Sequence, residues 1–157
     1  MEQKAYEILK KFNIDYKRFD HEPVTTLKGH LKMVEGPQVK NIVLRDKKAK
    51  NIYFIMIEES KEVNIDNLKI LLEENRLSFL SEDKLKEILM CEKGTVTPLG
   101  LYFDTEHRVK VIIDDELNVN ETIGLHPFVN TTTLNVLLKD LITFFDILNI
   151  EYKFIKL

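Results

Sequence analysis

Three short polar stretches interrupt otherwise apolar parts of this 157-residue sequence. They are the pair Lys40-Asn41, "GTVTP" over residues 94–98, and "HPFVN" over residues 126–130. A lysine ammonium and the backbone N–H groups of small loop residues can stabilise negative charge that develops on a substrate oxygen. Each stretch also has a simpler interpretation, as a solvent-facing lysine, a tight turn and a satisfied core histidine. Spacing alone does not decide between them.

Several familiar kinds of catalytic site are missing from the sequence. Residues 94–100 lack the lysine of a phosphate-binding loop, and the sequence contains no G-x-S-x-G nucleophile elbow. The four histidines are widely spaced, without an HExxH motif or paired cysteines, which argues against a zinc site. Cys91 ends a predicted helix whose negative pole should raise the pKa of its thiol. We expect no metal, no cofactor and no covalent nucleophile.

Composition is typical of one globular domain over residues 1–157, with 44% hydrophobic and 31% charged residues. The lone cysteine favours a reducing compartment. The N-terminal stretch has no continuous apolar segment of the kind found in signal peptides. No run approaches the roughly 18 apolar residues of a membrane span. We therefore expect a cytoplasmic protein that does not associate with membranes.

Charge is distributed unevenly, although the net charge is only −3. Residues 28–50 carry seven basic and two acidic groups, a local net charge of +5, whereas residues 51–157 carry eleven basic and nineteen acidic groups. Such asymmetry could present a positive face to a phosphate backbone. The simpler alternative is that the lysines of residues 47–50 only solvate a turn, and charge alone favours it.

Periodicity and turn residues predict an α+β domain with a mixed, largely antiparallel sheet and packed helices. Helices are predicted over residues 2–13, from Thr25 or Thr26 to about 34, over 66–72 with Asp66 as its cap, 81–90 capped by Ser81, and 139–149. Extended segments are predicted over residues 15–21, 39–46, 51–58, 99–103, 108–114, 121–130, 131–138 and 152–157. The turns at 47–50 and 104–107 should each close a hairpin.

Taken together, the polar stretches resemble the YbaK/prolyl-tRNA editing-domain family, and most closely its freestanding alanyl-tRNA(Pro) deacylases. The resemblance covers nearly the whole chain, in family order. It runs through "FDHEPVTT" (19–26), "VKNIVLRD" (39–46), "LSFLSEDKLKEIL" (77–89), "GTVTPLGL" (94–101), "VKVIID" (109–114) and "IGLHPFVNTTT" (123–133). It implies a sheet curved around a pocket and hydrolysis of the ester that joins a wrong amino acid to tRNA.

The resemblance also implies roles for individual residues. Lys40, Gly94 and His126 would be the catalytic residues, although we expect His126 to shape the pocket and not to act as a general base. The substrate-binding residues would be Thr25, Asn41, Thr95, Val96, Pro98, Phe128 and Asn130. The tRNA-binding residues would be Lys28, Lys32, Lys47, Lys48 and Lys50. Mischarged tRNA(Pro) is the implied partner, with prolyl-tRNA synthetase as a second candidate.

Physical chemistry is compatible with these roles. An aminoacyl ester is already activated, so a protein need only position water and stabilise an oxyanion. A proline pocket cannot strongly reject the smaller alanine, because a missing methylene is worth only about 1–3 kcal/mol. A second, smaller pocket can exclude proline by size, and alternation along an extended segment would place either Phe128 or Val129 in its wall. Three alternatives stay open: cysteinyl-tRNA(Pro) specificity, a non-catalytic aminoacyl-tRNA-binding or regulatory module, and a purely structural domain.

Overall fold

The protein is described by a computed structural model that covers residues 1–23 and 37–157. Its helices are α1 (Glu2–Lys11), α2 (Ile65–Leu71), α3 (Glu82–Leu89) and α4 (Leu138–Ile147), with the 3-10 helix η1 (Pro98–Phe103). Its strands are β1 (Tyr16–Asp20), β2 (Val39–Arg45), β3 (Ile52–Glu58), β4 (Ser78–Phe79), β5 (Val109–Asp114), β6 (Thr122–Leu125), β7 (Thr132–Leu137) and β8 (Tyr152–Ile155). The helix predicted from Thr25 or Thr26 to about residue 34 lies outside the described residues.

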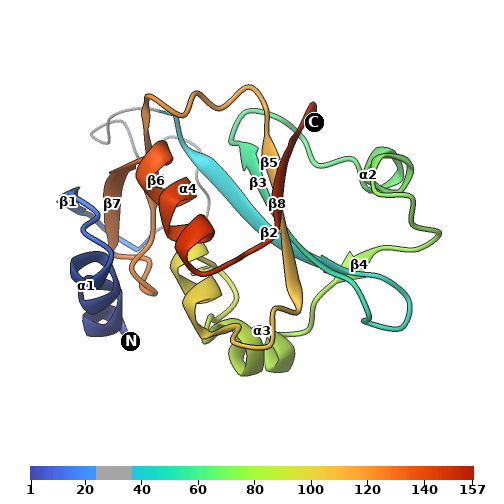
Figure 1. Cartoon of the computed structure of the whole chain (residues 1–157), viewed down its shortest axis with the longest axis horizontal. Coiled ribbons are helices and arrows are strands. Elements are labelled where there is room, and N and C mark those ends of the chain that lie inside the picture. The colour runs from blue at the N-terminus through green and yellow to red at the C-terminus, as the bar shows by residue number, and fades with distance from the viewer. Residues whose placement is uncertain (24–36) are drawn as a thin grey trace.

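These strands form two sheets, and the predicted α+β class is confirmed (Figure 1). The larger sheet has the strand order β4-β2-β3-β5-β8, and the smaller has the order β1-β7-β6. The smaller sheet is antiparallel throughout. In the larger sheet, β3 pairs with β5 and β5 with β8 in parallel, so this sheet is mixed. No described helix is long and apolar enough to cross a membrane.

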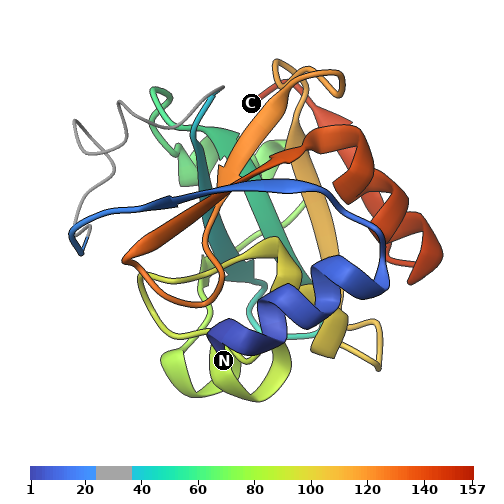
Figure 2. The same cartoon turned by 90° about the vertical axis from the view of Figure 1, so that its left-hand side faces the viewer.

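The main hydrophobic core fills the space between the two sheets and is closed by α1, α3, α4 and η1 (Figures 1 and 2). A second cluster lies on the other face of the larger sheet, beneath α2. The central strand β3 contributes to both clusters, with Phe54 and Met56 on one face and Ile55 and Ile57 on the other. Burial on both faces explains why its sequence is an unbroken apolar run.

One predicted hairpin, over residues 99–103 and 108–114, is wrong. The first segment is the helix η1, and β5 pairs in parallel with β3. Local chemistry accounts for the difference, because Pro98 suits a first helical turn and Thr97 Oγ1 accepts a hydrogen bond from Leu99 N. Gly100 allows η1 to approach α3 closely, since a Cβ atom there would lie 2.5 Å from Leu89 O.

Helix caps are partly as predicted. Ser81 Oγ caps α3 by accepting a hydrogen bond from Lys84 N at 3.2 Å, which confirms the predicted cap. Helix α2 is capped by Asn64, whose Oδ1 accepts from Asn67 N at 3.0 Å, and not by Asp66. Asp66 lies in the first turn instead, where a carboxylate is favoured by the helix dipole.

A buried carboxylate fixes the loop that follows β3. The side chain of Asp114, at the end of β5, is fully buried, and it accepts hydrogen bonds from Glu58 N, Glu116 N and Lys61 Nζ. Burial raises the pKa of Asp114, but the bonds from Lys61 and the two backbone groups outweigh it and hold this pKa below its ordinary range. The ionised form of Asp114 is therefore the stable one in the fold.

Replacing Asp114 with Asn should lower the free energy of unfolding by about 1.5–3 kcal/mol, the usual contribution of hydrogen bonds to a charged group. Because the pKa is depressed in the folded state, this contribution is present at neutral pH and is lost as the pH falls through the folded pKa. Urea unfolding of both proteins at pH 7 and pH 3 measures it. Asp115→Asn, at the exposed neighbouring position, is the control, and equal destabilisation by both variants at pH 7 would contradict the expectation.

Candidate functional site

Asn41 lies within β2, and its side chain is on the face of the larger sheet that packs against the main core. Its Nδ2 donates a hydrogen bond to Val96 O at 3.3 Å, which ties β2 to the loop of residues 94–98. Since a carbonyl oxygen can only accept, the amide NH₂ must face Val96. Asn41 Oδ1 is then left buried, without a hydrogen-bond partner in the part of the chain that the structure describes. A buried unpaired acceptor is costly and is suited to a donor group of a ligand.

A small polar pocket lies on one side of Asn41. The volume of this pocket is about 10 Å³, which is room for roughly one water molecule. It forms where Gln38, just before β2, is bridged in parallel to Gly124 of β6. A Cβ atom at Gly124 would lie 2.6 Å from Gln38 Oε1 and 3.1 Å from Thr133 Cγ2, so a side chain there would crowd the pocket. Its lining residues are Gln38, Val39, Asn41, Gly124, Leu125, His126 and Thr133.

His126 forms one wall of this small pocket. Its Nδ1 lies 3.1 Å from Thr132 O, and because this carbonyl can only accept, Nδ1 carries the proton. Burial lowers the pKa of His126, the bond to Thr132 opposes this, and the neighbouring His21 lowers it further. The neutral ring that results has Nε2 as a hydrogen-bond acceptor.

His21, at the end of β1, supports the same region. Its Nδ1 lies 2.8 Å from Glu22 O and its Nε2 lies 2.8 Å from Thr133 Oγ1. The ring centroids of His21 and His126 are 6.4 Å apart. Asp20 Oδ1 accepts a further hydrogen bond from Thr132 Oγ1 at 2.9 Å. Residues at the end of β1 therefore hold Thr132 and Thr133 in place, and Thr132 O in turn fixes the ring of His126.

Asn41 also lines a larger, mostly apolar cleft of about 580 Å³. It follows the edge of β2 between the 94–98 loop, β4 and the start of α3. Gly94 adopts a left-handed φ of +90°, a conformation that favours glycine. The lining residues of the cleft are Asn41, Ile42, Val43, Phe79, Leu80, Ser81, Glu82, Leu85, Lys93, Gly94 and Val96.

The structure thus brings four of the predicted site residues together. Asn41 lines both cavities, Gly94 and Val96 line the cleft, and His126 lines the small pocket. Other predicted residues of the 94–98 loop lie nearby without lining either cavity. Thr95 Oγ1 donates to Glu92 O, and Pro98 is buried beneath the loop.

Lys40 is not placed with Gly94 and His126. Neighbouring residues of a strand point to opposite faces, so Lys40 lies on the face of β2 opposite Asn41. There its Nζ donates a hydrogen bond to the backbone carbonyl of Lys61. Lys61 in turn is held by its ion pair with Asp114, at 2.9 Å.

Phe128 lines neither cavity. Strand β6 ends at Leu125, so the alternation expected along an extended segment does not apply to residue 128. Phe128 has a φ of +65° and is buried in the main core. The centroid of its ring lies 6.2 Å from that of Phe103, in an edge-to-face contact. Val129 and Asn130 follow in the connection to β7 and line neither cavity.

The predicted tRNA-binding lysines are divided by the described ranges. Lys28 and Lys32, with Thr25 of the predicted substrate site, lie outside the described residues. Lys47, Lys48 and Lys50 are exposed on the β2–β3 turn, which projects on the side away from α1 in Figure 1. Asp46 orders this turn by accepting hydrogen bonds from Lys50 N and Asn51 Nδ2.

Sequence reasoning missed the small pocket's closest contacts, which involve Gln38, Gly124 and Thr133. One signal was available, because an isolated glycine inside a strand often marks a close backbone approach. The pKa of Cys91 is raised, as predicted, but the cause is burial and not the helix pole; it reaches about 11, which leaves the thiol a poor nucleophile. Over residues 1–23 and 37–157, the structure shows no group of three His, Cys, Asp or Glu side chains placed to hold a metal ion.

Comparison with known proteins gives this geometry its context. The model of the aminoacyl-tRNA editing domain family matches residues 21–144, which include both cavities. This chain belongs to the aminoacyl-tRNA editing domain family. The resemblance inferred from the polar stretches is therefore confirmed at the level of the family.

Relatives of the chain carry related names. Over 136 residues it is 31% identical to the prolyl-tRNA editing protein ProX of Acetoanaerobium sticklandii, covering 85% of this chain and 83% of ProX. It is 30% identical over 145 residues to prolyl-tRNA synthetase associated domain-containing protein 1 of Danio rerio, covering 89% and 78%. The crystal structure of a candidate trans-editing enzyme for prolyl-tRNA synthetase superposes with a TM-score of 0.70 at 13% identity, covering 97% and 94%. At that identity the likeness shows the fold alone.

The state of His126 can be tested through stability. His126→Asn keeps a side-chain N–H that can donate to Thr132 O but removes the titrating ring. Because the folded pKa lies below the ordinary 6.5, the unfolded chain binds more protons as the pH falls below about 6.5. The wild type should therefore lose free energy of unfolding relative to the variant between pH 7 and pH 5. Parallel thermal unfolding curves at both pH values would contradict the buried, neutral state.

Proposed function

We propose that this protein hydrolyses the ester of mischarged alanyl-tRNA(Pro) and spares correctly charged prolyl-tRNA(Pro). The observation that carries the proposal is the small polar pocket lined by Asn41 and His126 in a member of the editing-domain family. A void that admits one water can accept a methyl group with little rearrangement. The names of the relatives ProX and prolyl-tRNA synthetase associated domain-containing protein 1 support a substrate charged on tRNA(Pro).

The chemistry requires an oxyanion site and a positioned water. In the 94–98 loop, Thr95 N–H is already bonded to Glu92 O, so the backbone donors of Gly94 and Val96 are the better candidates. The unpaired Asn41 Oδ1 can accept from the substrate's α-ammonium or from a ribose hydroxyl. His126 contributes Nε2 as a further acceptor in the pocket wall. The adjacent ribose hydroxyl of the substrate assists the water, and no side-chain nucleophile is needed.

Selectivity follows from the tightness of the small pocket. Proline's ring would have to displace Gln38, Thr133 or the backbone at Gly124, and overpacking of this kind costs about 1–3 kcal/mol. Alanine avoids that cost. Gly124 and the two residues that crowd it, Gln38 and Thr133, therefore set the size limit in this proposal, in place of Phe128.

Cationic groups bind the tRNA in this proposal. Lys40 acts as a point charge for the terminal phosphate or the ester carbonyl, which requires its side chain to leave the carbonyl of Lys61 on the opposite face of β2. Lys47, Lys48 and Lys50 extend the positive surface along β2, with Lys28 and Lys32 as further contacts from the preceding segment. Arg45 lies about 17 Å from Lys40 at about 3.3 Å per residue, so the turn would meet phosphates beyond the terminal nucleotide.

Lys40→Ala should lower the rate of deacylation by about 10²- to 10³-fold, the usual effect of removing an electrostatic group from such a site. The midpoint of thermal unfolding should change little, since the described bond of Lys40 is to a single neutral carbonyl. Single-turnover deacylation measures the rate, and Lys139→Ala, at an exposed position on α4, is the control. Wild-type activity in Lys40→Ala would remove Lys40 from the site.

The decisive experiment offers the protein tRNA(Pro) charged with alanine, cysteine, serine or proline, at substoichiometric enzyme. Alanine should be released fastest and proline slowest. Faster release of cysteine would assign the cysteinyl specificity instead. Equal release of alanine and proline, or tight binding without turnover, would contradict an editing deacylase and favour a binding module. Repeating the panel with prolyl-tRNA synthetase tests whether that enzyme hands over the substrate.

A further inference from the structure

We infer that Asn135 extends the acyl pocket and binds a hydroxyl group there, so that serine is a second amino acid that this protein releases from tRNA(Pro). The inference rests on the proposed function, because it adds a substrate to the same hydrolytic site. Asn135 is a specificity-determining residue in it, since its side chain would contact the amino acid and not the ester.

Asn135 carries a buried amide that lacks hydrogen bonds. The residue is 3% exposed, and neither its Nδ2 nor its Oδ1 has a hydrogen-bond partner among residues 1–23 and 37–157. Buried polar groups in this state are rare in folded proteins, because each unmade bond is costly. The amide can both donate and accept, and a hydroxyl group on a ligand meets both needs through one oxygen atom.

Asn135 lies beside the small pocket. On β7 it is paired with Gly124 of β6, and directly opposed residues of two strands have Cβ positions about 4.5–5.5 Å apart on the same face. Leu134 and Val136 belong to the main core, so Asn135 and Gly124 face the other side of the smaller sheet. Because Gly124 has no side chain, this residue leaves open the space next to the Asn135 amide.

The same space borders the walls of the small pocket. The two atoms nearest to the Cβ position of Gly124 are Gln38 Oε1, at 2.6 Å, and Thr133 Cγ2, at 3.1 Å. Gln38, Gly124 and Thr133 all line the small pocket, whereas Asn135 lies just beyond Gly124 and outside this lining. A ligand group that enters the small pocket and extends past Gly124 would therefore reach Asn135.

Neighbouring side chains on this face have other contacts. Thr133 Oγ1 lies 2.8 Å from His21 Nε2. Lys17 is paired with Asn135 on β1, and its Nζ lies 5.4 Å from the ring centroid of Phe19. In this inference the substrate supplies the hydrogen bonds that Asn135 lacks.

Size and polarity together separate serine from other amino acids. The methyl group of alanine ends within the small pocket. Serine has one further heavy atom, a hydroxyl oxygen that can accept from Asn135 Nδ2 and donate to Asn135 Oδ1. The thiol of cysteine forms only weak hydrogen bonds, and the ring of proline has only carbon at the corresponding place. We therefore expect release in the order alanine, serine, cysteine, proline.

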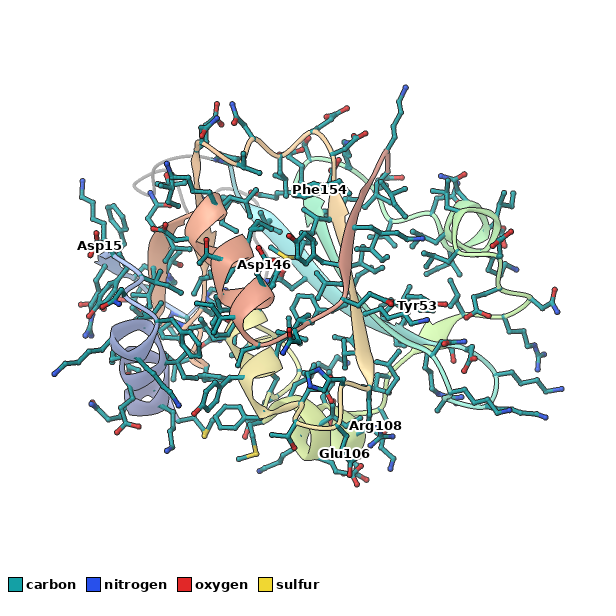
Figure 3. The ribbon with its side chains drawn as sticks, viewed as in Figure 1. Asp15, Tyr53, Glu106, Arg108, Asp146 and Phe154 are labelled. Atoms are coloured by element: carbon teal, nitrogen blue, oxygen red, sulfur yellow. The ribbon has the colours of Figure 1, made fainter. Side chains whose placement is uncertain are left out.

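Asn135→Leu tests the inference, because leucine has nearly the same shape and its side chain forms no hydrogen bonds. The ratio of kcat/KM for seryl-tRNA(Pro) to that for alanyl-tRNA(Pro) should fall by about 5- to 150-fold, which converts to the 1–3 kcal/mol of an unpaired buried polar group. The midpoint of thermal unfolding should not fall, since the change removes two unpaired polar atoms. Asp15→Leu, a similar change in shape at an exposed position just before β1, is the matched control (Figure 3).

A second measurement uses the wild type itself and does not depend on turnover. Amide-linked seryl-adenosine and alanyl-adenosine keep the amino acid but have no ester to hydrolyse. In NMR titrations, the side-chain NH₂ resonances of Asn135 should shift more with the seryl compound than with the alanyl compound. Equal shifts with both compounds would overturn the inference.

The kinetic outcomes are equally distinct. An unchanged ratio in Asn135→Leu would mean that Asn135 binds an ordered water at most, and the inference would be wrong. An equal loss with both substrates would make Asn135 structural, which also overturns it. So would a wild type that releases alanine and no serine.

The two proposals fail in different ways. If the wild type cleaves alanyl-tRNA(Pro) but Asn135→Leu keeps the ratio, the deacylase stands and the hydroxyl site is wrong. If the Asn135 resonances respond to the seryl compound but the wild type releases no amino acid, the hydroxyl site stands and the protein is a binding module.

Discussion

The close approach of Gln38 to Gly124 is the contact on which the site depends. It joins the start of β2, in the larger sheet, to β6, in the smaller sheet. Glycine is needed at this point because a Cβ atom would collide with Gln38 Oε1 and crowd Thr133. The small pocket is the space that remains where the two sheets meet, and the side chains of Gln38 and Thr133 bound it next to Gly124.

Alternation along β2 divides the chemistry between two faces of one strand. Asn41 faces the cavities and is tied to the 94–98 loop, whereas Lys40 faces the opposite side and is held by the carbonyl of Lys61. In the proposed mechanism, the positioning group and the cationic group therefore come from different faces of the sheet. The buried Asp114 contributes indirectly. Its ion pair holds Lys61, whose backbone carbonyl accepts the hydrogen bond from Lys40 Nζ.

Local signals in the sequence predicted the features that depend on nearby residues. The cap at Ser81 and the β2–β3 hairpin are examples, since both are decided within a few residues of chain. The parallel pairing of β3 with β5 was not predicted, because it joins segments separated by α2, α3 and η1 and depends on the main core. The polar stretches identified the family, yet the orientation of Phe128 required knowing that β6 ends at Leu125. A strand's end is set by tertiary contacts that no local pattern contains.

The topology of the smaller sheet also bears on how the chain acquires its site during synthesis. Strand β1 pairs with β7, so Tyr16 meets Val136 and Phe19 meets Thr133 across more than a hundred residues of chain. Closing so long a loop is slow and needs the intervening core to be collapsed first. His21 can reach Thr133 only when nearly all of the chain has left the ribosome. A chain whose residue 133 has not yet left the ribosome would therefore hold neither the contact of His21 with Thr133 nor the small pocket.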